Sequence, residues 1–151
     1  MAGPVPNPKE AIISIHPRFA EAILAGSKKV ELRRRIPNLE AGTLLWIYAT
    51  VPVKAVVGSA IIASIIRDTP EEIWNTYSQH SAIDRDEFDR YFEGTTEAVC
   101  IKLRAVKRVR HVGIERLRKW KVGFHPPQVI SKIANSDAIR LRKLIQPLGL
   151  K

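Results

Sequence analysis

Two long apolar runs with a proline between them constrain the fold more than any other feature of this sequence. Residues Thr43–Thr50 (TLLWIYAT) are almost continuously apolar and aromatic, which is typical of a central strand. Residues Lys54–Ile66 (KAVVGSAIIASII) are rich in β-branched side chains, and Gly58 within them predicts a bulge or a close backbone approach. Pro52 interrupts the sequence between the runs. We therefore expect the core of this protein to be a sheet.

The shorter segments before these runs predict a strand, a helix and a second strand. Ala11–His16 is an apolar run suited to a buried strand. Arg18–Ala25 has apolar side chains four residues apart, which predicts a helix, and Gly26 is placed to end it in a left-handed conformation. Lys29–Arg35 alternates between apolar and charged residues and predicts a half-buried strand with one charged face.

Later segments add helices and one more strand. A capping box at Thr69–Glu72 starts one helix, and Asp84 starts a second helix in which Phe88, Tyr91 and Phe92 are expected to face inward. The remaining expectations are a strand over Glu97–Val109, a short basic helix over Ile114–Lys121, and a last helix over Asp137–Leu144 that packs through Ile139, Leu141, Leu144 and Ile145. Strands cluster apart from helices, so the fold class is α+β, with a strongly curved sheet or small β-barrel flanked by helices.

The length and composition are those of one ordinary globular domain. With 151 residues, we expect an extended lead-in over residues 1–10 and a single domain over residues 11–151. No apolar run approaches the roughly 18–20 residues of a membrane span, and the first residues lack a secretory pattern, so the cytoplasm is the expected location. The single cysteine, Cys100, lies in an apolar strand pattern and is expected to be a buried, inert thiol.

Positive charge is concentrated in the C-terminal third. Residues 1–100 hold 11 Lys and Arg against 13 Asp and Glu, whereas residues 101–151 hold 14 against 2. Nine basic residues and one acid, Glu115, lie between Lys102 and Lys121. Such a block either is solvated or meets a polyanion, and nucleic acid is the first partner to consider.

The motif Gly26–Arg33 (GSKKVELR) fits a G-x-K-x-x-E-x-R pattern directly after the first predicted helix. This pattern resembles that of the ASCH domains of the PUA-like superfamily. The resemblance covers about residues 11–128 and implies a small β-barrel flanked by helices, with a cleft beside the motif strand. Further matching pieces are Tyr48–Thr50, Val56–Gly58, the PEEIW and EFDRYF helices, and Pro126–Gln128.

What the resemblance implies for function is binding of RNA or of a nucleotide, with a possible regulatory role. A small bacterial branch of the family hydrolyses the amide of acetylated cytidine with a lysine, a threonine and a glutamate. Lys28 matches that lysine, but Glu31 stands at the threonine position, and the glutamate position falls near Ser81, where no acid stands. Another member is described as a metal-assisted ribonuclease. The alternative to nucleic-acid binding is therefore a hydrolase acting on RNA or on a modified nucleoside, and the sequence leaves open whether the chain is an enzyme.

The motif also has a chemistry of its own. Lys28 is a flexible point charge suited to binding a phosphate or a carbonyl oxygen. If the chain is an enzyme, Lys28 and Glu31 are the candidate catalytic residues. Glu31 and Arg33, with Arg34 beside them, could present an acceptor and planar donors to a base edge or a phosphate. Alternatively, Glu31 and Arg33 only pair on the surface, which needs no function.

Other candidate binding residues are scattered along the chain: Thr50 and Lys54 beside Pro52, Arg108 and Arg110 in the basic block, and Gln128 after two prolines. Trp46 and Tyr48 could stack on bases, but core packing is the better interpretation for both. Since His16, His80, His111 and His125 show no ligand spacing, we expect no metal and no other cofactor. The expected partner is nucleic acid, RNA first.

Overall fold

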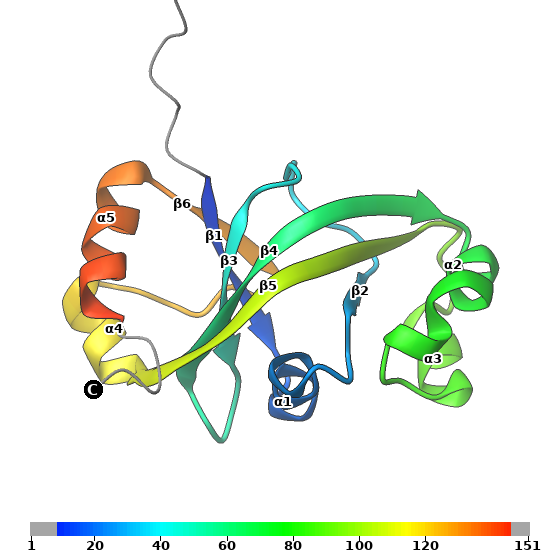
Figure 1. The fold of residues 1–151 in the computed structure, drawn as a ribbon, viewed down its shortest axis with the longest axis horizontal. Helices are drawn as coiled ribbons and strands as arrows, with labels where there is room; N and C mark the ends of the chain where they lie inside the picture. Colours follow the sequence, from blue (N-terminus) through cyan, green and yellow to red (C-terminus); the bar gives the residue numbers. More distant parts are fainter. Residues whose placement is uncertain (1–8, 146–151) are drawn as a thin grey trace, which may run out of the picture.

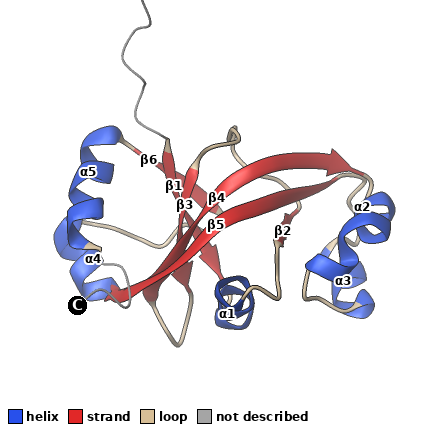
Figure 2. Cartoon of the chain, viewed as in Figure 1, coloured by secondary structure: helices blue, strands red, loops and turns tan. Residues whose placement is uncertain are grey.

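A mixed sheet of six strands curls into a half-barrel at the centre of the molecule (Figures 1 and 2). The computed structural model describes residues 9–145. The strands lie in the order β2-β5-β4-β3-β1-β6; β1 and β3 are parallel, and the other neighbouring pairs are antiparallel. In chain order the elements are β1 (Glu10–Ile15), α1 (Pro17–Ala25), β2 (Val30–Arg33), β3 (Leu44–Ala49), β4 (Ala55–Asp68), α2 (Pro70–Tyr77), the 3-10 turn η1 (Ser78–His80), α3 (Arg85–Tyr91), β5 (Ala98–Gly113), α4 (Ile114–Trp120), β6 (Ile130–Ile133) and α5 (Asn135–Leu144).

Helices cover the sheet in three places, each with its own cluster of buried side chains. α1 packs on one face through Ala20 and Ile23. α4 and α5 cover the other face at one end of the long β4–β5 pair, where Leu117 and Leu141 are fully buried. At the opposite end, α2 and α3 pack on β2 and on the start of β5 (Figure 1). Phe88 of α3 is fully buried in this cluster. The two helical pairs therefore lie at opposite ends of the molecule.

The turn from α1 into β2 has the geometry that the sequence predicts. Gly26 has a φ of 88°, and its N–H donates to the carbonyls of Ala22 and Ile23 at the end of α1. At Gly58 the structure has both a bulge and a close backbone approach. The registers of the β3–β4 and β4–β5 pairs shift beside it, and an added Cβ would lie 2.4 Å from Leu24 Cδ2. Gly26 thus lets the chain turn from α1 into β2, and Gly58 leaves room for α1 to pack closely on β4.

Most of the expected elements are confirmed. The α+β class and the strongly curved sheet are as predicted, and both apolar runs are strands. Trp46 and Tyr48 are buried in the core. Cys100 is buried as well, and this burial raises the pKa of its thiol to about 12, which keeps it protonated and inert.

Some details differ from expectation. β6 was not predicted, because Ile130–Ile133 is too short to show a pattern of its own. Ile139 is 43% exposed and Tyr91 is 39% exposed, so neither packs inward as expected. β1 begins at Glu10, one residue early. Of the other lead-in residues, Lys9 is described, and residues 1–8 lie outside the described range together with residues 146–151. No helix in residues 9–145 is long and apolar enough to cross a membrane.

Candidate functional site

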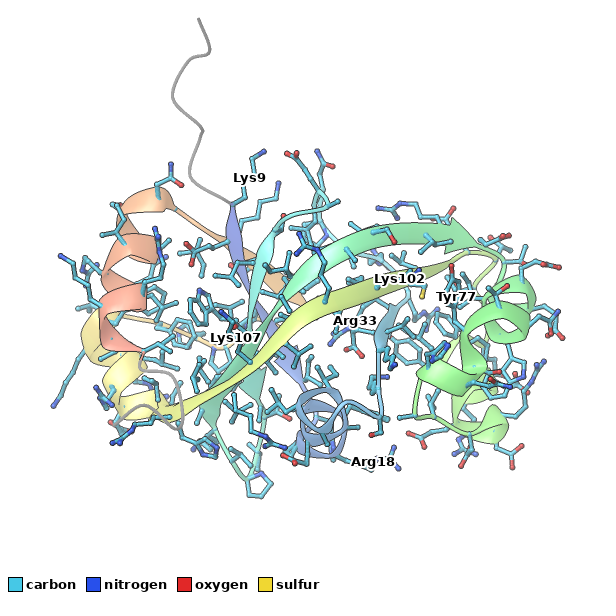
Figure 3. The ribbon with its side chains drawn as sticks, in the orientation of Figure 1. Lys9, Arg18, Arg33, Tyr77, Lys102 and Lys107 are labelled. Atoms are coloured by element: carbon cyan, nitrogen blue, oxygen red, sulfur yellow. The ribbon has the colours of Figure 1, made fainter. Side chains whose placement is uncertain are left out.

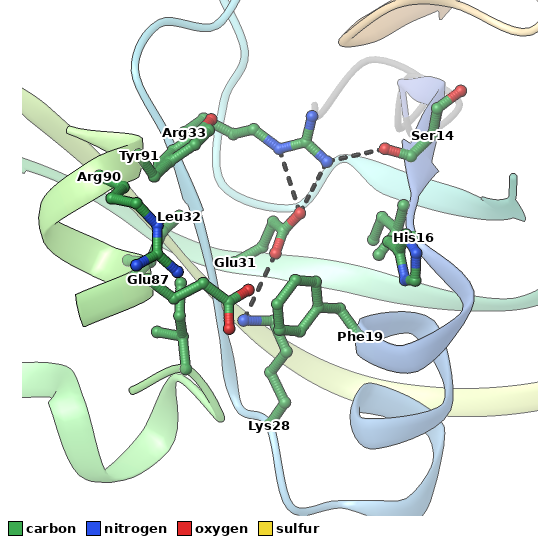
Figure 4. Close-up of a pocket in the computed structure, with 12 residues that line it drawn as sticks. Ser14, His16, Phe19, Lys28, Glu31, Leu32, Arg33, Glu87, Arg90 and Tyr91 are labelled. Carbon is green, nitrogen blue, oxygen red and sulfur yellow. Dashed lines mark hydrogen bonds and ion pairs between the residues drawn. The ribbon is translucent and has the colours of Figure 1, made fainter. Parts of the chain in front are cut away.

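A cavity of about 470 Å³ lies in the seam of the half-barrel, between β1 and β2, which do not pair with each other (Figure 4). We call it the seam cavity. It is lined by the end of β1, by α1, by the motif strand β2 with the turn before it, and by α3. The motif therefore faces a cavity, as the predicted cleft beside this strand required.

Three charged side chains of the motif form a buried ion cluster on the wall of the seam cavity (Figure 4). Glu31 Oε2 accepts from Arg33 Nε at 3.1 Å and from Arg33 Nη2 at 2.7 Å, and Glu31 Oε1 lies 3.6 Å from Lys28 Nζ. The side chains of Lys28, Glu31 and Arg33 are only 3%, 7% and 13% exposed. Glu31 and Arg33 do pair, as the alternative expected, but the expected surface location is wrong, because this cluster is nearly closed off from water.

Contacts from distant parts of the chain hold the cluster in place. Lys28 Nζ donates to the carbonyl of Ser81 at 2.5 Å, and it lies 4.8 Å from the centre of the Phe19 ring. Arg33 Nη2 donates to the carbonyl of Ser14 at 2.8 Å, which joins β2 to β1 across the seam. Each charged group is thus fixed by two or more partners, so the positions of the three side chains are set by the fold.

Burial changes the proton affinity of Lys28. Loss of hydration lowers the pKa of the Lys28 ammonium below its ordinary value, and the neighbouring Glu31 carboxylate only partly offsets this effect. An amine held in this way gives up its proton more readily than a lysine on the surface. It can serve as a proton donor or acceptor as well as a positive charge.

The opposite wall of the seam cavity is formed by α3. Glu87 Oε2 lies 2.5 Å from Arg18 Nη2, and this pair links α3 to α1. Arg90 and Tyr91 line the same wall, and both are exposed. Among residues 9–145, Arg90 has no carboxylate within salt-bridge distance, so its guanidinium is free for a ligand. Sequence reasoning missed this wall, because helix periodicity could not show that α3 faces a motif more than fifty residues earlier.

The remaining predicted site residues do not line the seam cavity. Thr50 lies beside it, since its N–H donates to the carbonyl of Ile15, and Arg34 is exposed just after β2. Lys54, with a φ of 53°, Arg110 and Gln128 are exposed elsewhere. Arg108 is held by Glu21 of α1, with nitrogen–oxygen distances of 3.0 and 2.6 Å. The structure thus brings together Lys28, Glu31 and Arg33 and leaves the other six outside.

Within the described residues 9–145, no group of three or more His, Cys, Asp or Glu side chains is placed to hold a metal ion. The ionisable side chains that line the seam cavity are its lysine, its carboxylates, its arginines, His16 and Tyr91.

Comparisons with known proteins point to one family. Residues 9–131 match the model described as "Domain of unknown function (DUF365)". A Zymomonas mobilis protein named "ASCH domain-containing ribonuclease" is 36% identical over 140 residues, or 93% of this chain and 95% of that protein. The crystal structure of ASCH from Zymomonas mobilis has a TM-score of 0.88 at 35% identity, covering 92% of this chain and 97% of that one. The N-terminal domain of Thermococcus gammatolerans McrB bound to m5C DNA has a TM-score of 0.51 at 9% identity, which is a likeness of fold alone.

Proposed function

The chain belongs to the ASCH domain family, and from that premise we propose that it binds RNA, with one nucleotide in the seam cavity. The observation that carries this proposal is the buried ion cluster on the cavity wall. A cavity of about 470 Å³ falls within the size range of small-molecule sites, and its few polar groups are held in fixed positions.

The cluster has the chemistry to read a base edge. A carboxylate offers about four acceptor positions, and Glu31 uses two of them on Arg33, so it can still accept from an exocyclic amino group. Arg33 uses Nε and Nη2 but has donors left on Nη1, which can meet a carbonyl oxygen. An acceptor beside a donor can pair with a base edge that presents a donor beside an acceptor.

Groups on the α3 wall can complete the binding of a nucleotide. Tyr91 is a partly exposed aromatic ring on which a base can stack. Arg90, without a carboxylate partner in residues 9–145, suits a phosphate of the same nucleotide. Both residues lie opposite the motif, so a ligand would contact two sides of the seam.

The rest of the RNA would lie on the basic surface, which we define as the exposed cations of residues 102–121. These side chains follow β5 and α4 along the molecule, and Lys102 and Lys107 mark part of that path in Figure 3. Contacts of this kind bind phosphates without reading sequence. They supply affinity that falls steeply with salt, whereas the seam cavity supplies selectivity.

Fluorescence anisotropy with labelled oligonucleotides tests the proposal. We expect single-stranded RNA to bind more tightly than duplex RNA or DNA of the same sequence, with an affinity that falls as salt is raised. Glu31→Gln keeps the size of the side chain and removes its charge, so it should reduce the preference among sequences more than the affinity for any one of them. Equal binding of every sequence by the wild-type protein would contradict a nucleotide site in the seam.

A second candidate function is RNA cleavage, and one finding favours it: the 36% identical Zymomonas mobilis relative carries the name ribonuclease. Cleavage without a metal needs a base for the ribose hydroxyl and an acid for the leaving oxygen. Lys28 and Glu31, 3.6 Å apart, form one pair of seam-cavity groups that can exchange a proton, and His16 and Glu87 line the same cavity. In this candidate function the same cavity would hold the scissile nucleotide.

Incubation of a labelled RNA with the pure protein separates binding from cleavage. Reactions with magnesium, with manganese and with a chelator show whether a metal is needed. Cleavage that Lys28→Met abolishes, without loss of RNA binding, would establish a catalytic role for Lys28. Intact RNA under all three conditions would leave binding as the function.

A further inference from the structure

A second cavity lies between α4 and α5, at the end of the molecule away from α2 and α3 (Figure 1). Its volume is about 500 Å³, and we call it the basic cleft. It is lined by Arg116, Lys119, Trp120, Arg140 and Leu144. Three of these five side chains are cations and the other two are apolar. Such a lining suits an anion with a high charge density.

The basic cleft is held together by bonds between its two helices. Trp120 Nε1 donates to the carbonyl of Asp137 at 2.9 Å, and the Arg140 guanidinium donates to the carbonyl of Trp120. Asp137 Oδ1 accepts from Arg140 Nη1 at 3.3 Å, and Asp137 Oδ2 lies 3.5 Å from Lys121. Arg140 is therefore fixed at the cleft before any ligand arrives, and so is Trp120, which is only 6% exposed.

The other two cations of the cleft lack a counter-charge. The carboxylates between residues 101 and 145 are Glu115 and Asp137. Glu115 pairs with Arg118 at 3.3 Å, and Asp137 is engaged by Arg140 and Lys121. Within residues 9–145, neither Arg116 nor Lys119 lies within salt-bridge distance of a carboxylate. Two free cations thus converge with an anchored guanidinium on one cavity, where their mutual repulsion favours a bound anion.

We propose that the basic cleft is a second binding site, separate from the seam cavity, and that it takes a phosphate group. Arg116 and Lys119 would neutralise the phosphate, while Arg140 would donate to it from a fixed position. The phosphate can come from an RNA backbone or from free phosphate. The assignment to an RNA backbone rests on the proposed function, whereas the site itself does not. With RNA bound, the seam cavity and the basic cleft would contact one strand at two separated points.

Nuclear magnetic resonance of the tryptophan side chains tests the site directly. The protein has three tryptophans, so its spectrum shows three indole N–H signals, and Trp120→Phe identifies the one at the cleft. We expect inorganic phosphate and a single-stranded RNA 12-mer each to shift the Trp120 signal. In Arg116→Gln/Lys119→Gln both shifts should disappear. The control Arg67→Gln/Lys132→Gln loses the same charge from exposed positions outside the cleft and should keep both shifts.

RNA affinity gives a second, quantitative readout. The salt slope is the slope of the logarithm of the RNA affinity against the logarithm of the salt concentration. Loss of one phosphate contact in Arg116→Gln/Lys119→Gln should reduce the magnitude of this slope by about 0.7 and lower the affinity by about 3- to 10-fold. The control variant should keep the wild-type slope. Equal slopes in the wild type and in both variants would overturn the assignment to an RNA backbone.

The possible outcomes separate this proposal from the proposed function. A Trp120 shift with phosphate but not with RNA upholds the site and assigns it to free phosphate. Failure of the wild-type protein to bind any RNA removes the proposed function, yet a phosphate-induced Trp120 shift would still uphold the cleft. A Trp120 signal that neither phosphate nor RNA moves overturns the proposal.

Discussion

Cations meet opposite environments in the seam cavity and in the basic cleft. Lys28 and Arg33 are almost completely buried and share the carboxylate of Glu31. Arg116 and Lys119 are exposed, and within the described part of the chain no carboxylate neutralises them. Lys28 and Arg33 contribute to the stability of the fold through their buried ion pairs, whereas Arg116 and Lys119 only add positive charge to its surface. We infer that the seam cavity determines the selectivity for a ligand, and that the basic cleft contributes to the affinity for a polyanion.

The largest expected effect comes from removing the carboxylate of the seam. Glu31→Ala leaves Lys28 and Arg33 buried without their counter-charge, and breaking a buried ion pair in this way costs about 3–5 kcal/mol. Urea denaturation followed by circular dichroism measures this loss in the free energy of unfolding. Glu31→Gln should cost less, because the amide oxygen can still accept from Arg33.

A matched control is the exposed pair of Glu21 with Arg108. Glu21→Ala removes a carboxylate from an equally short arginine contact, but at the surface, so it should leave the free energy of unfolding almost unchanged. Similar losses in Glu21→Ala and Glu31→Ala would contradict the distinction between buried and exposed cations.

A smaller loss of stability is expected where α5 docks on the sheet. Glu10 is buried; its Oε1 accepts from Trp46 Nε1 at 2.7 Å, and its Oε2 lies 3.0 Å from Arg142 Nε. Arg142→Leu removes the cation and leaves a buried carboxylate. Because the Arg142 side chain is itself 40% exposed, we expect the cost to be below the about 3–5 kcal/mol of a fully buried pair. Urea denaturation measures the cost. The Trp120 indole signal should also shift if this contact positions α5 beside α4.

A weaker effect concerns pH. Because burial lowers the pKa of Lys28, the unfolded chain binds more protons at this residue than the folded chain as the pH approaches the ordinary value of 10.5. The Lys28 contribution to stability therefore becomes more favourable with rising pH. The free energy of unfolding of the wild type minus that of Lys28→Met should rise as the pH is raised toward 10.5. A difference that stays constant or falls would show that Lys28 is not strained by burial.

The smallest expected effect separates two neighbouring arginines of the basic surface. Arg108 is already paired with Glu21, while Arg110 is exposed and has no carboxylate within salt-bridge distance in residues 9–145. Arg110→Gln should lower the salt slope of RNA binding by about 0.7, and Arg108→Gln should lower it less. Anisotropy titrations at three or more salt concentrations measure both slopes. Equal changes would mean that RNA displaces Glu21 from Arg108.

Sequence reasoning located the motif strand but misjudged its surroundings. Strand parity correctly placed Glu31 and Arg33 on the same side of β2. Parity cannot show what covers that side, because Ser81, Glu87 and Arg90 reach it from far along the chain. For the same reason, the sequence predicted an exposed charged face where the structure has a buried ion cluster.

The same limit applies to the C-terminal third. Its basic charge was evident from composition, and α4 was expected at nearly its observed position. The cavity between α4 and α5 could not be predicted, since it depends on bonds between Trp120, Asp137 and Arg140 across two helices. Local patterns predicted the helices and the long strand here but not β6, whereas the sites arise from contacts between elements.

Competition by single nucleotides tests the central claim most directly. If the seam cavity holds one nucleotide, at least one of the four ribonucleoside monophosphates should displace a labelled RNA from the wild-type protein. Glu31→Gln should weaken or change this preference, and Arg116→Gln/Lys119→Gln should leave it intact. Competition that is the same for all four nucleotides, is unaffected by Glu31→Gln and is lost in the cleft variant would contradict the account.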